Sequence, residues 1–289
     1  MLAQLECLPC LVRQAVEMAR MSEIGPEVQL QLLREVMALM SRTDLYRSPP
    51  EIMGEIGMLF HRVTGVRDPY ARVKRDHTET ALGMIEEMDS MIRSSDDPFV
   101  TGLKLAAAGN IIDLGARSRV DQGEIAAVLR EAAELPISGI HPHILKIRAE
   151  NARRILYLAD NAGETVFDRK FIELLPPGRT TVAVRGGPAL NDATMEDAVH
   201  AGLDLVAELV ENGSNAPATV LDDCSAEFIR LFEEADLIIA KGQGNYESLS
   251  GRTSRVHFLF RVKCGLVADH SGYSMGSLVL DGPPEEAIR

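Results

Sequence analysis

The chain has 289 residues, of which 46% are hydrophobic and 25% are charged, the ordinary composition of a globular protein. It carries 30 Lys and Arg against 43 Asp and Glu, and this net charge of −13 has the wrong sign for a nucleic-acid-binding surface. No apolar run approaches the ~20 residues of a membrane-spanning helix, and the first residues lack the basic segment and cleavage site of a secretory signal. Four scattered cysteines suit a reducing compartment. We therefore expect a cytoplasmic protein that acts on a small molecule, with no nucleic-acid or membrane partner.

The first part of the chain, residues 1–152, reads as a series of helices that form one or two helical subdomains. Apolar side chains recur at helical spacing in four segments, at 8–19, 26–40, 52–63 and 73–91. Pro26 suits the first position of the second helix, and the Ser48-Pro49-Pro50 run separates the second helix from the third.

The second part, residues 153–289, changes to short apolar runs that alternate with helical stretches. The strand candidates lie at 155–159, 181–184, 204–207, 237–240, 256–262 and 266–268. Helical stretches at 166–175, 194–201 and 225–234 fall between some of them. This alternation predicts βαβ units and a parallel sheet. The expected fold class is α/β, with a helical N-terminal part followed by a Rossmann-like, mostly parallel α/β/α sandwich.

Polar residues follow three of the expected strands, where ligands of an open parallel sheet bind. These residues are Asp160, Asn161, Gly163 and Glu164, then Arg185, Asn191 and Asp192, and then Lys241, Asn245 and Glu247. Carboxylate and amide oxygens suit an octahedral ion such as Mg²⁺ or Mn²⁺, and the absence of His and Cys from these loops argues against zinc. A lysine beside glycines is a common way to hold phosphate oxygens. The set therefore favours metal-assisted phosphoryl chemistry.

Each of these signals alone has an ordinary structural explanation. An Asp or Asn after a strand is more often a helix cap or a turn residue than a ligand. The GxxxxGK[ST] pattern of a P-loop is absent, and no GxGxxG run follows the first strand, so nucleotide binding of either kind is disfavoured.

Several longer strings resemble one known family. DNAGETVFDR (160–169), VRGGPALNDATMEDA (184–198) and AKGQGNYESLSG (240–251) are similar to motifs of the domain-of-unknown-function 89 family, also called the damage-control phosphatases or ARMT-like metal-binding proteins. ECLPC (6–10), AAAGNIIDLG (107–115) and FLFRVKC (258–264) resemble its microbial, CxxC-containing branch.

The resemblance implies a metal-dependent phosphatase, a phosphomonoesterase that hydrolyses small phosphometabolites such as sugar phosphates. It implies a divalent metal, Mn²⁺, Mg²⁺, Co²⁺ or Ni²⁺, held by Asp160, Asn161 and Asp192, and a lysine, Lys241, that contacts the phosphate. It also implies that Asn110 brings the helical part to the cleft, together with Asp113. The physiological phosphoester and the oligomeric state stay open.

The residue-based interpretation and the resemblance agree on where the site lies. We expect Asp160, Asn161 and Asp192 to be metal ligands, and Lys241 and Arg185 to neutralise phosphate charge. Gly163, Glu164, Asn191, Asn245 and Glu247 are expected to bind the substrate or orient the ligands. The general base stays open between Asp192, Glu164 and a hydroxide on the metal.

The Cys7-x-x-Cys10 pair has three open interpretations: structural packing, an auxiliary metal or redox role, or catalysis. Cys264 follows a strand and is a possible neighbour of the pair.

Two other functions also stay open. A carboxyl methyltransferase that uses S-adenosylmethionine would need a glycine-rich loop after the first strand, where Gly163 stands alone, and an acidic residue after the second, where Arg185 stands. A non-catalytic metal-binding sensor would keep the metal and show no turnover.

Overall fold

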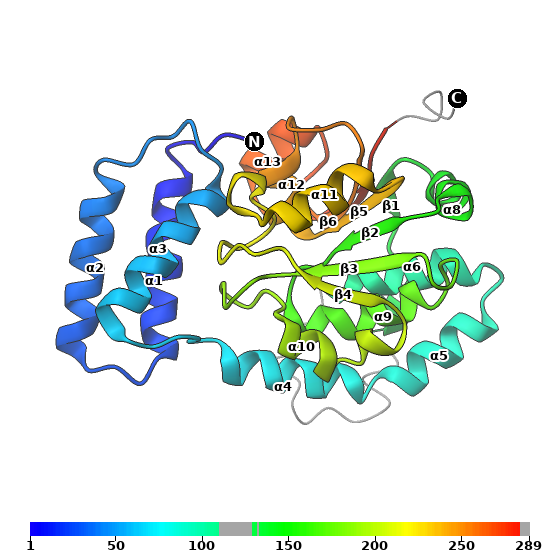
Figure 1. Ribbon diagram of the computed structural model, residues 1–289, viewed down its shortest axis with the longest axis horizontal. Helices are drawn as coiled ribbons and strands as arrows, with labels where there is room; N and C mark the ends of the chain where they lie inside the picture. Colours follow the sequence, from blue (N-terminus) through cyan, green and yellow to red (C-terminus); the bar gives the residue numbers. More distant parts are fainter. Residues whose placement is uncertain (110–128, 132, 284–289) are drawn as a thin grey trace.

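The computed structural model describes residues 1–109, 129–131 and 133–283. The first helices are amphipathic, and each buries one apolar stripe. They are α1 (Cys7–Met21), α2 (Pro26–Met40), α3 (Pro49–Thr64), α4 (Ala71–Leu82), α5 (Ile85–Ser94) and α6 (Pro98–Ala108). Helices α1 to α3 pack on one another beside the sheet, and α4 and α5 run beneath it (Figure 1). The α3 helix begins with a capping box, in which Ser48 and Glu51 each accept a hydrogen bond from the other's backbone N–H.

Seven strands form one sheet in the order β1-β7-β6-β5-β2-β3-β4, and every neighbouring pair is parallel except β6 and β7. The strands are β1 (Ile137–Gly139), β2 (Ile155–Leu158), β3 (Thr180–Val184), β4 (Glu208–Glu211), β5 (Leu237–Lys241), β6 (Val256–Arg261) and β7 (Leu278–Asp281). The helices between them are α8 (Pro142–Asn151), α9 (Thr165–Ile172), α10 (Met195–His200), α11 (Ala226–Glu234), α12 (Gly242–Leu249) and α13 (Gly265–Ser271). Short 3₁₀ turns lie at Ala162–Glu164, Leu203–Leu205 and Leu221–Asp223.

Helices cover both faces of the sheet, because alternate side chains of each strand point to opposite faces. Ile155 and Tyr157 of β2 pack with α6, α8 and α9 on one face. Leu156 and Leu158 pack with α11, α12 and α13 on the other face. The expected α/β class, with N-terminal helices and a mostly parallel sheet, is confirmed.

Two of the expected strands are wrong. Residues 204–207 form the end of a 3₁₀ turn and a short loop, and β4 begins only at Glu208. Residues 266–268 lie in α13, which ends at Gly272 in the left-handed conformation. A run of three apolar residues fits one helical turn as well as a strand, so its periodicity cannot decide between them.

The sequence interpretation also missed two short strands and one helix break. The edge strand β1 and the antiparallel β7 have three and four residues, too few for a pattern to be recognised. The expected helix at 73–91 is two helices, α4 and α5, separated at Gly83 and Met84. Because β1 pairs with β7, the expected all-helical part contains a strand of the sheet. The division of the chain at residue 152 stays a prediction.

Among the described residues, no helix combines the length and the apolar character needed to cross a membrane.

Candidate functional site

The loops after β2 and β3 meet at the carboxyl edge of the sheet because the two strands are parallel neighbours. Asn161 and Asp192 form an isolated β-bridge, and the Asp160 carbonyl accepts a hydrogen bond from the Ala193 N–H at 2.8 Å. The loops are therefore fixed to each other by their backbones. This brings Asp160, Asn161 and Asp192 together, as the sequence predicts.

The Asp160 carboxylate lies against the start of α12, which follows β5. Gly242 at that point has a φ of +80°, and a Cβ there would lie 1.9 Å from Asp160 Oδ2. Only glycine lets the backbone turn this way and pass so close to the carboxylate. Asp160 is buried, and its burial, followed by the nearby charges of Glu164 and Asp192, raises its pKa well above the usual value.

Asn161 lies between two carboxylates. Its Nδ2 donates to Glu164 Oε1 at 2.5 Å and to Asp160 Oδ2 at 3.3 Å. Gly163 and Glu164 are both buried in the short turn that follows, and burial raises the pKa of Glu164 while Lys241 and Lys263 lower it. The oxygen and nitrogen of an asparagine amide can exchange places without moving the backbone, so the same side chain can present Oδ1 to a cation.

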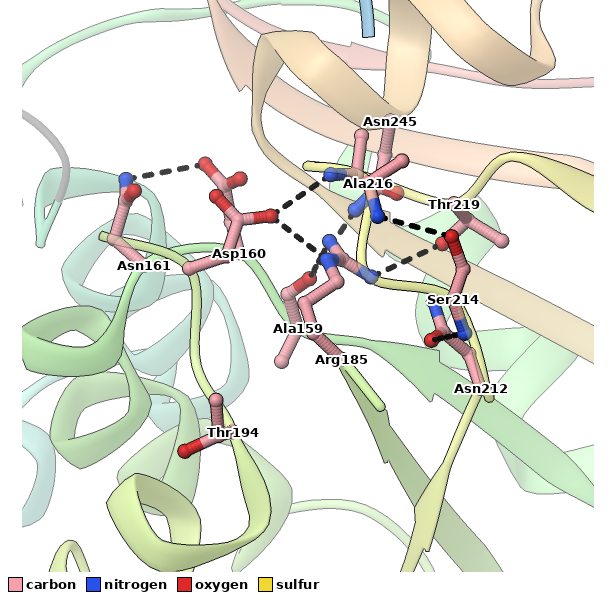
Figure 2. Close-up of polar contacts among 12 residues, drawn as sticks. Ala159, Asp160, Asn161, Arg185, Thr194, Asn212, Ser214, Ala216, Thr219 and Asn245 are labelled. Carbon is pink, nitrogen blue, oxygen red and sulfur yellow. Dashed lines mark hydrogen bonds and ion pairs between the residues drawn. The ribbon is translucent and has the colours of Figure 1, made fainter. Parts of the chain in front are cut away.

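Arg185 donates hydrogen bonds to Asp192 and to two groups on neighbouring loops. Its Nε donates to Asp192 Oδ2 at 2.7 Å. Its other nitrogens donate to the Ala159 carbonyl at 2.9 Å and to Thr219 Oγ1 at 3.3 Å (Figure 2). The Ala218 N–H donates to the same Asp192 oxygen at 2.8 Å. Because Arg185 is only 1% exposed, its contacts favour a role in positioning Asp192 over direct contact with a phosphate.

Lys241 ends β5 and is buried among acceptors. Its Nζ donates to Asp168 Oδ1 at 2.5 Å, to the Ala106 carbonyl at 2.8 Å and to Glu164 Oε2 at 3.4 Å. Burial alone would lower the pKa of Lys241, but the charges of Asp168 and Glu164 outweigh it and raise the pKa. Lys241 thus ties α6, α9 and the turn that carries Glu164 to β5.

The structure also describes three other expected site residues, Asn245, Asn191 and Glu247. Asn245 is fully buried, where its Nδ2 donates to the Lys241 carbonyl at 2.7 Å and to the Ala159 carbonyl at 3.2 Å, while its Oδ1 has no hydrogen-bond partner. The Asn191 carbonyl accepts from the Ala162 N–H at 2.9 Å. Glu247 follows Asn245 by two residues on α12, accepts from Gln243 Nε2 at 2.7 Å, and has a pKa raised to about 7 by burial. Asn110 and Asp113 lie outside the described residues.

The sequence interpretation missed Asp168 and Lys263. Asp168 is fully buried and accepts from both Lys241 and, at 2.8 Å, the Tyr157 hydroxyl. Lys263 is exposed just after β6, and its charge lowers the pKa values of Asp160 and Glu164. Both residues lie within the family-like strings 160–169 and 258–264, and a search for charged residues after every strand would have found Lys263.

The donor set fits a hard divalent cation. Asp160 and Asp192 would supply carboxylate oxygens, and Asn161 would supply an amide oxygen once its amide is turned over. A cation there would relieve the unfavourable charge of the buried, mutually repelling carboxylates. Within the described ranges, no group of three or more His, Cys, Asp or Glu side chains has a metal-holding arrangement. A metal here would therefore depend on the amide and on water for its remaining ligands.

The cysteine pair lies at the start of α1. Cys7 is buried and Cys10 is exposed, and burial raises the pKa of the Cys7 thiol. Cys264 lies near enough for its charge to act on Cys7. Gln243 Nε2 lies 3.8 Å from Cys264 Sγ, and Gln243 Oε1 accepts from the Lys263 N–H at 2.8 Å.

Comparison with known proteins identifies the family. The family profile of the damage-control phosphatase ARMT1-like domain matches residues 3–279. The chain belongs to this family. A damage-control phosphatase of Archaeoglobus fulgidus is 32% identical over 94% of this chain and 96% of its own length. An uncharacterised protein of Methanocaldococcus jannaschii is 34% identical over 95% of this chain and 93% of its own length.

A solved relative has the same fold as this member of the damage-control phosphatase family. The crystal structure of a family protein from Pyrococcus horikoshii superposes with a TM-score of 0.89 and 29% identity, covering 98% of this chain and 100% of that chain. The names of the curated relatives support a phosphatase-type function.

Proposed function

We propose that this chain is a divalent-metal-dependent phosphomonoesterase that hydrolyses small phosphorylated metabolites such as sugar phosphates. The observation that carries the proposal is the joining of Asp160, Asn161 and Asp192 by a backbone bridge at the carboxyl edge of the sheet. The curated relatives named damage-control phosphatases support the reaction type.

The three side chains would hold the metal, which when bound would polarise a phosphoryl oxygen. Asp192 would present Oδ1, because its Oδ2 already accepts from Arg185 and Ala218. Mn²⁺, Mg²⁺, Co²⁺ and Ni²⁺ are all compatible with this set of oxygen donors.

The chain's own cations would stabilise the negative charge of the transferring phosphoryl group. We favour Lys263 for direct contact with the phosphate, because it is exposed and its charge acts on both Asp160 and Glu164. Lys241 is already held by Asp168 and the Ala106 carbonyl, which favours a positioning role for it. Glu164 is a candidate general base, because Lys241 and Asn161 fix both of its oxygens beside the ligand cluster.

The test is phosphate release from a panel of sugar phosphates and p-nitrophenyl phosphate. Chelator-treated protein is supplied with one metal at a time, and wild type is compared with Asp160→Ala, Asp192→Ala and Lys263→Ala. We expect turnover only with metal, its loss in both aspartate variants, and a raised KM in Lys263→Ala.

Asp222→Ala is the matched control, because Asp222 is an exposed carboxylate paired with Arg252 at 2.7 Å. It should keep full activity. Tight metal binding with no turnover on any ester would instead favour the sensor function. Binding of S-adenosylmethionine would favour the methyltransferase.

A further inference from the structure

A large cavity lies at the amino edge of the sheet, opposite the candidate active site. Its volume is about 950 Å³, and its lining includes the residues that directly precede three parallel strands: Arg154 before β2, Asp236 before β5 and Arg255 before β6. The four residues of β2 separate the two edges by about 13 Å, at the usual rise of a strand. The cavity is therefore distinct from the site formed by Asp160, Asn161 and Asp192.

The lining of this cavity is strongly cationic in a protein whose net charge is −13. The charged residues of the lining are Arg148, Arg153, Arg154, Arg255 and Asp236. Asp236 Oδ2 already accepts the backbone N–H groups of Arg153 and Arg154, both at 2.9 Å. The lining itself thus contains four guanidinium groups and one carboxylate, and Glu234 outside it pairs with Arg154.

Two of these arginines, Arg154 and Arg255, donate to nearby carbonyl and carboxylate groups with only some of their N–H groups. Arg154 Nη1 donates to Glu234 at 2.8 Å, and Arg255 donates to the Glu233 carbonyl at 3.0 Å and the Phe232 carbonyl at 3.4 Å. A guanidinium carries five N–H donors, so both side chains keep donors for a further acceptor. The planar fork of arginine matches phosphate and carboxylate groups.

A buried histidine anchors another arginine of the lining. His257 is 2% exposed, and its Nε2 accepts from Arg148 Nη1 at 2.6 Å, which requires a neutral ring. Burial, and then the Arg148 charge, lower the pKa of His257 to about 4. The histidine therefore holds the Arg148 guanidinium in place without neutralising its charge.

A second cavity provides a contrast. About 670 Å³ in volume, it is lined near α4 and α10 by cations and carboxylates together. Its buried Lys74 bonds to Asp197 at 2.7 Å and to Asp68 at 2.8 Å. The buried cation of that cavity is paired with two carboxylates of the same lining, whereas the lining at the amino edge holds four arginines and one carboxylate.

We propose that the cavity at the amino edge is a second ligand site that binds a small polyanion, through phosphate or carboxylate groups held by Arg148, Arg153, Arg154 and Arg255. The volume lies within the range of small-molecule sites, roughly 300–1,000 Å³. A small ligand is favoured over a nucleic acid because the positive charge is local and the chain as a whole is acidic.

The test is isothermal titration calorimetry of the full-length, chelator-treated protein with pyrophosphate and, separately, with citrate. We expect saturable binding of at least one of them with a Kd below about 1 mM. Arg153→Gln and Arg148→Met should each weaken that binding at least about tenfold, the effect of one charge-assisted hydrogen bond. Comparison of the pyrophosphate titration with the citrate titration distinguishes a phosphate ligand from a carboxylate ligand.

Two variants serve as matched controls for the loss of one positive charge. Arg72→Gln changes an arginine whose side chain is 91% exposed on α4, and Arg62→Gln changes one whose side chain is 73% exposed on α3. Both should bind the anion like wild type. Arg153→Gln is the safer test of the site, because Arg153 contributes to the fold through its backbone N–H to Asp236.

Three results would overturn the proposal. They are no saturable binding of either anion, an equal loss of affinity in Arg72→Gln, and unchanged affinity in both cavity variants. Tighter binding of a single-stranded RNA than of either small anion, lost in Arg153→Gln, would replace the small ligand with a nucleic acid.

Discussion

At the scale of single residues, the arrangement of the site depends on side chains that do not touch the expected metal position. Arg185 is among the largest fully buried side chains of the described residues, and it links the loop after β2, through the Ala159 carbonyl, to Asp192 after β3. Such supporting contacts orient metal ligands, and their loss commonly lowers metal affinity about 10- to 100-fold.

Replacing this arginine tests the positioning role directly. We expect Arg185→Gln to lower the affinity for Mn²⁺ at least about tenfold in calorimetric titration, because Asp192 loses its Nε donor. Thr219→Val removes only the 3.3 Å contact to Arg185 and should have a smaller effect in the same direction.

Arg252→Gln, which breaks an exposed pair with Asp222, is the control and should bind Mn²⁺ like wild type. Unchanged Mn²⁺ affinity in a folded Arg185→Gln protein would show that Asp192 needs no such support.

A second residue-scale prediction concerns pH. Burial raises the pKa of Glu247 to about 7, above its usual value, so the folded state favours the protonated carboxyl. The contribution of Glu247 to stability is therefore present below its unfolded pKa and is lost as pH rises through about 7.

Urea denaturation of wild type and Glu247→Gln at several pH values measures this effect. From about pH 5 to about pH 8, the stability of the variant relative to wild type should rise by about 2.5 kcal/mol. The two proteins compared at the acid end provide the control, since both folded proteins then carry a neutral side chain at position 247. A difference that does not change with pH would show that Glu247 titrates alike in the folded and unfolded chains.

At the scale of elements, the junction between β5 and α12 determines where Asp160 lies. Gly242 there has a φ of +80°, and its missing Cβ leaves the space that Asp160 Oδ2 occupies. We expect Gly242→Ala to displace the carboxylate and to abolish Mn²⁺ binding and metal-dependent turnover.

Gly251→Ala is a matched control because Gly251 has a φ of +81°, and a Cβ added there would meet no atom within 4 Å. Both substitutions strain the backbone by about 1 kcal/mol, but only the first disturbs Asp160. Equal Mn²⁺ affinities in the two variants would rule out the close contact as a determinant of the site.

The strands show which parts of the fold could be predicted from the sequence. The buried strands β2, β3, β5 and β6 were predictable because each is a continuous apolar run that ends at a polar loop. The edge strand β1 and the antiparallel β7 were not, because three or four residues carry no readable period.

The candidate site also contains contacts that the sequence predicts and contacts that it does not. The joining of Asp160, Asn161 and Asp192 follows from their places after neighbouring parallel strands. The partners of Lys241 and Arg185 do not, because Asp168 lies 73 residues from Lys241 and Thr219 lies 34 residues from Arg185. Such contacts depend on how helices and loops pack against the sheet, which no local pattern specifies.

At the scale of the whole molecule, the expected metal position joins segments far apart in the chain. The loops after β2, β3 and β5 converge there, and Lys241 connects them to α6 through the Ala106 carbonyl and to α9 through Asp168. A cation bound at Asp160 and Asp192 would relieve the repulsion between carboxylates from two of these loops. Metal binding and global stability should therefore be linked.

Thermal unfolding measures this linkage without any substrate. Mn²⁺ at about 100 times its Kd should stabilise the chelator-treated protein by about 2.7 kcal/mol, which for a chain of this size raises the Tm by roughly 4–5 °C. Asp192→Asn should lose most of this rise, because the cation then lacks one charged ligand. Arg153→Gln, at the opposite edge of the sheet, should keep it. If Mn²⁺ raised the Tm of Asp192→Asn as much as that of wild type, the metal would bind elsewhere and the ligand assignment would be wrong.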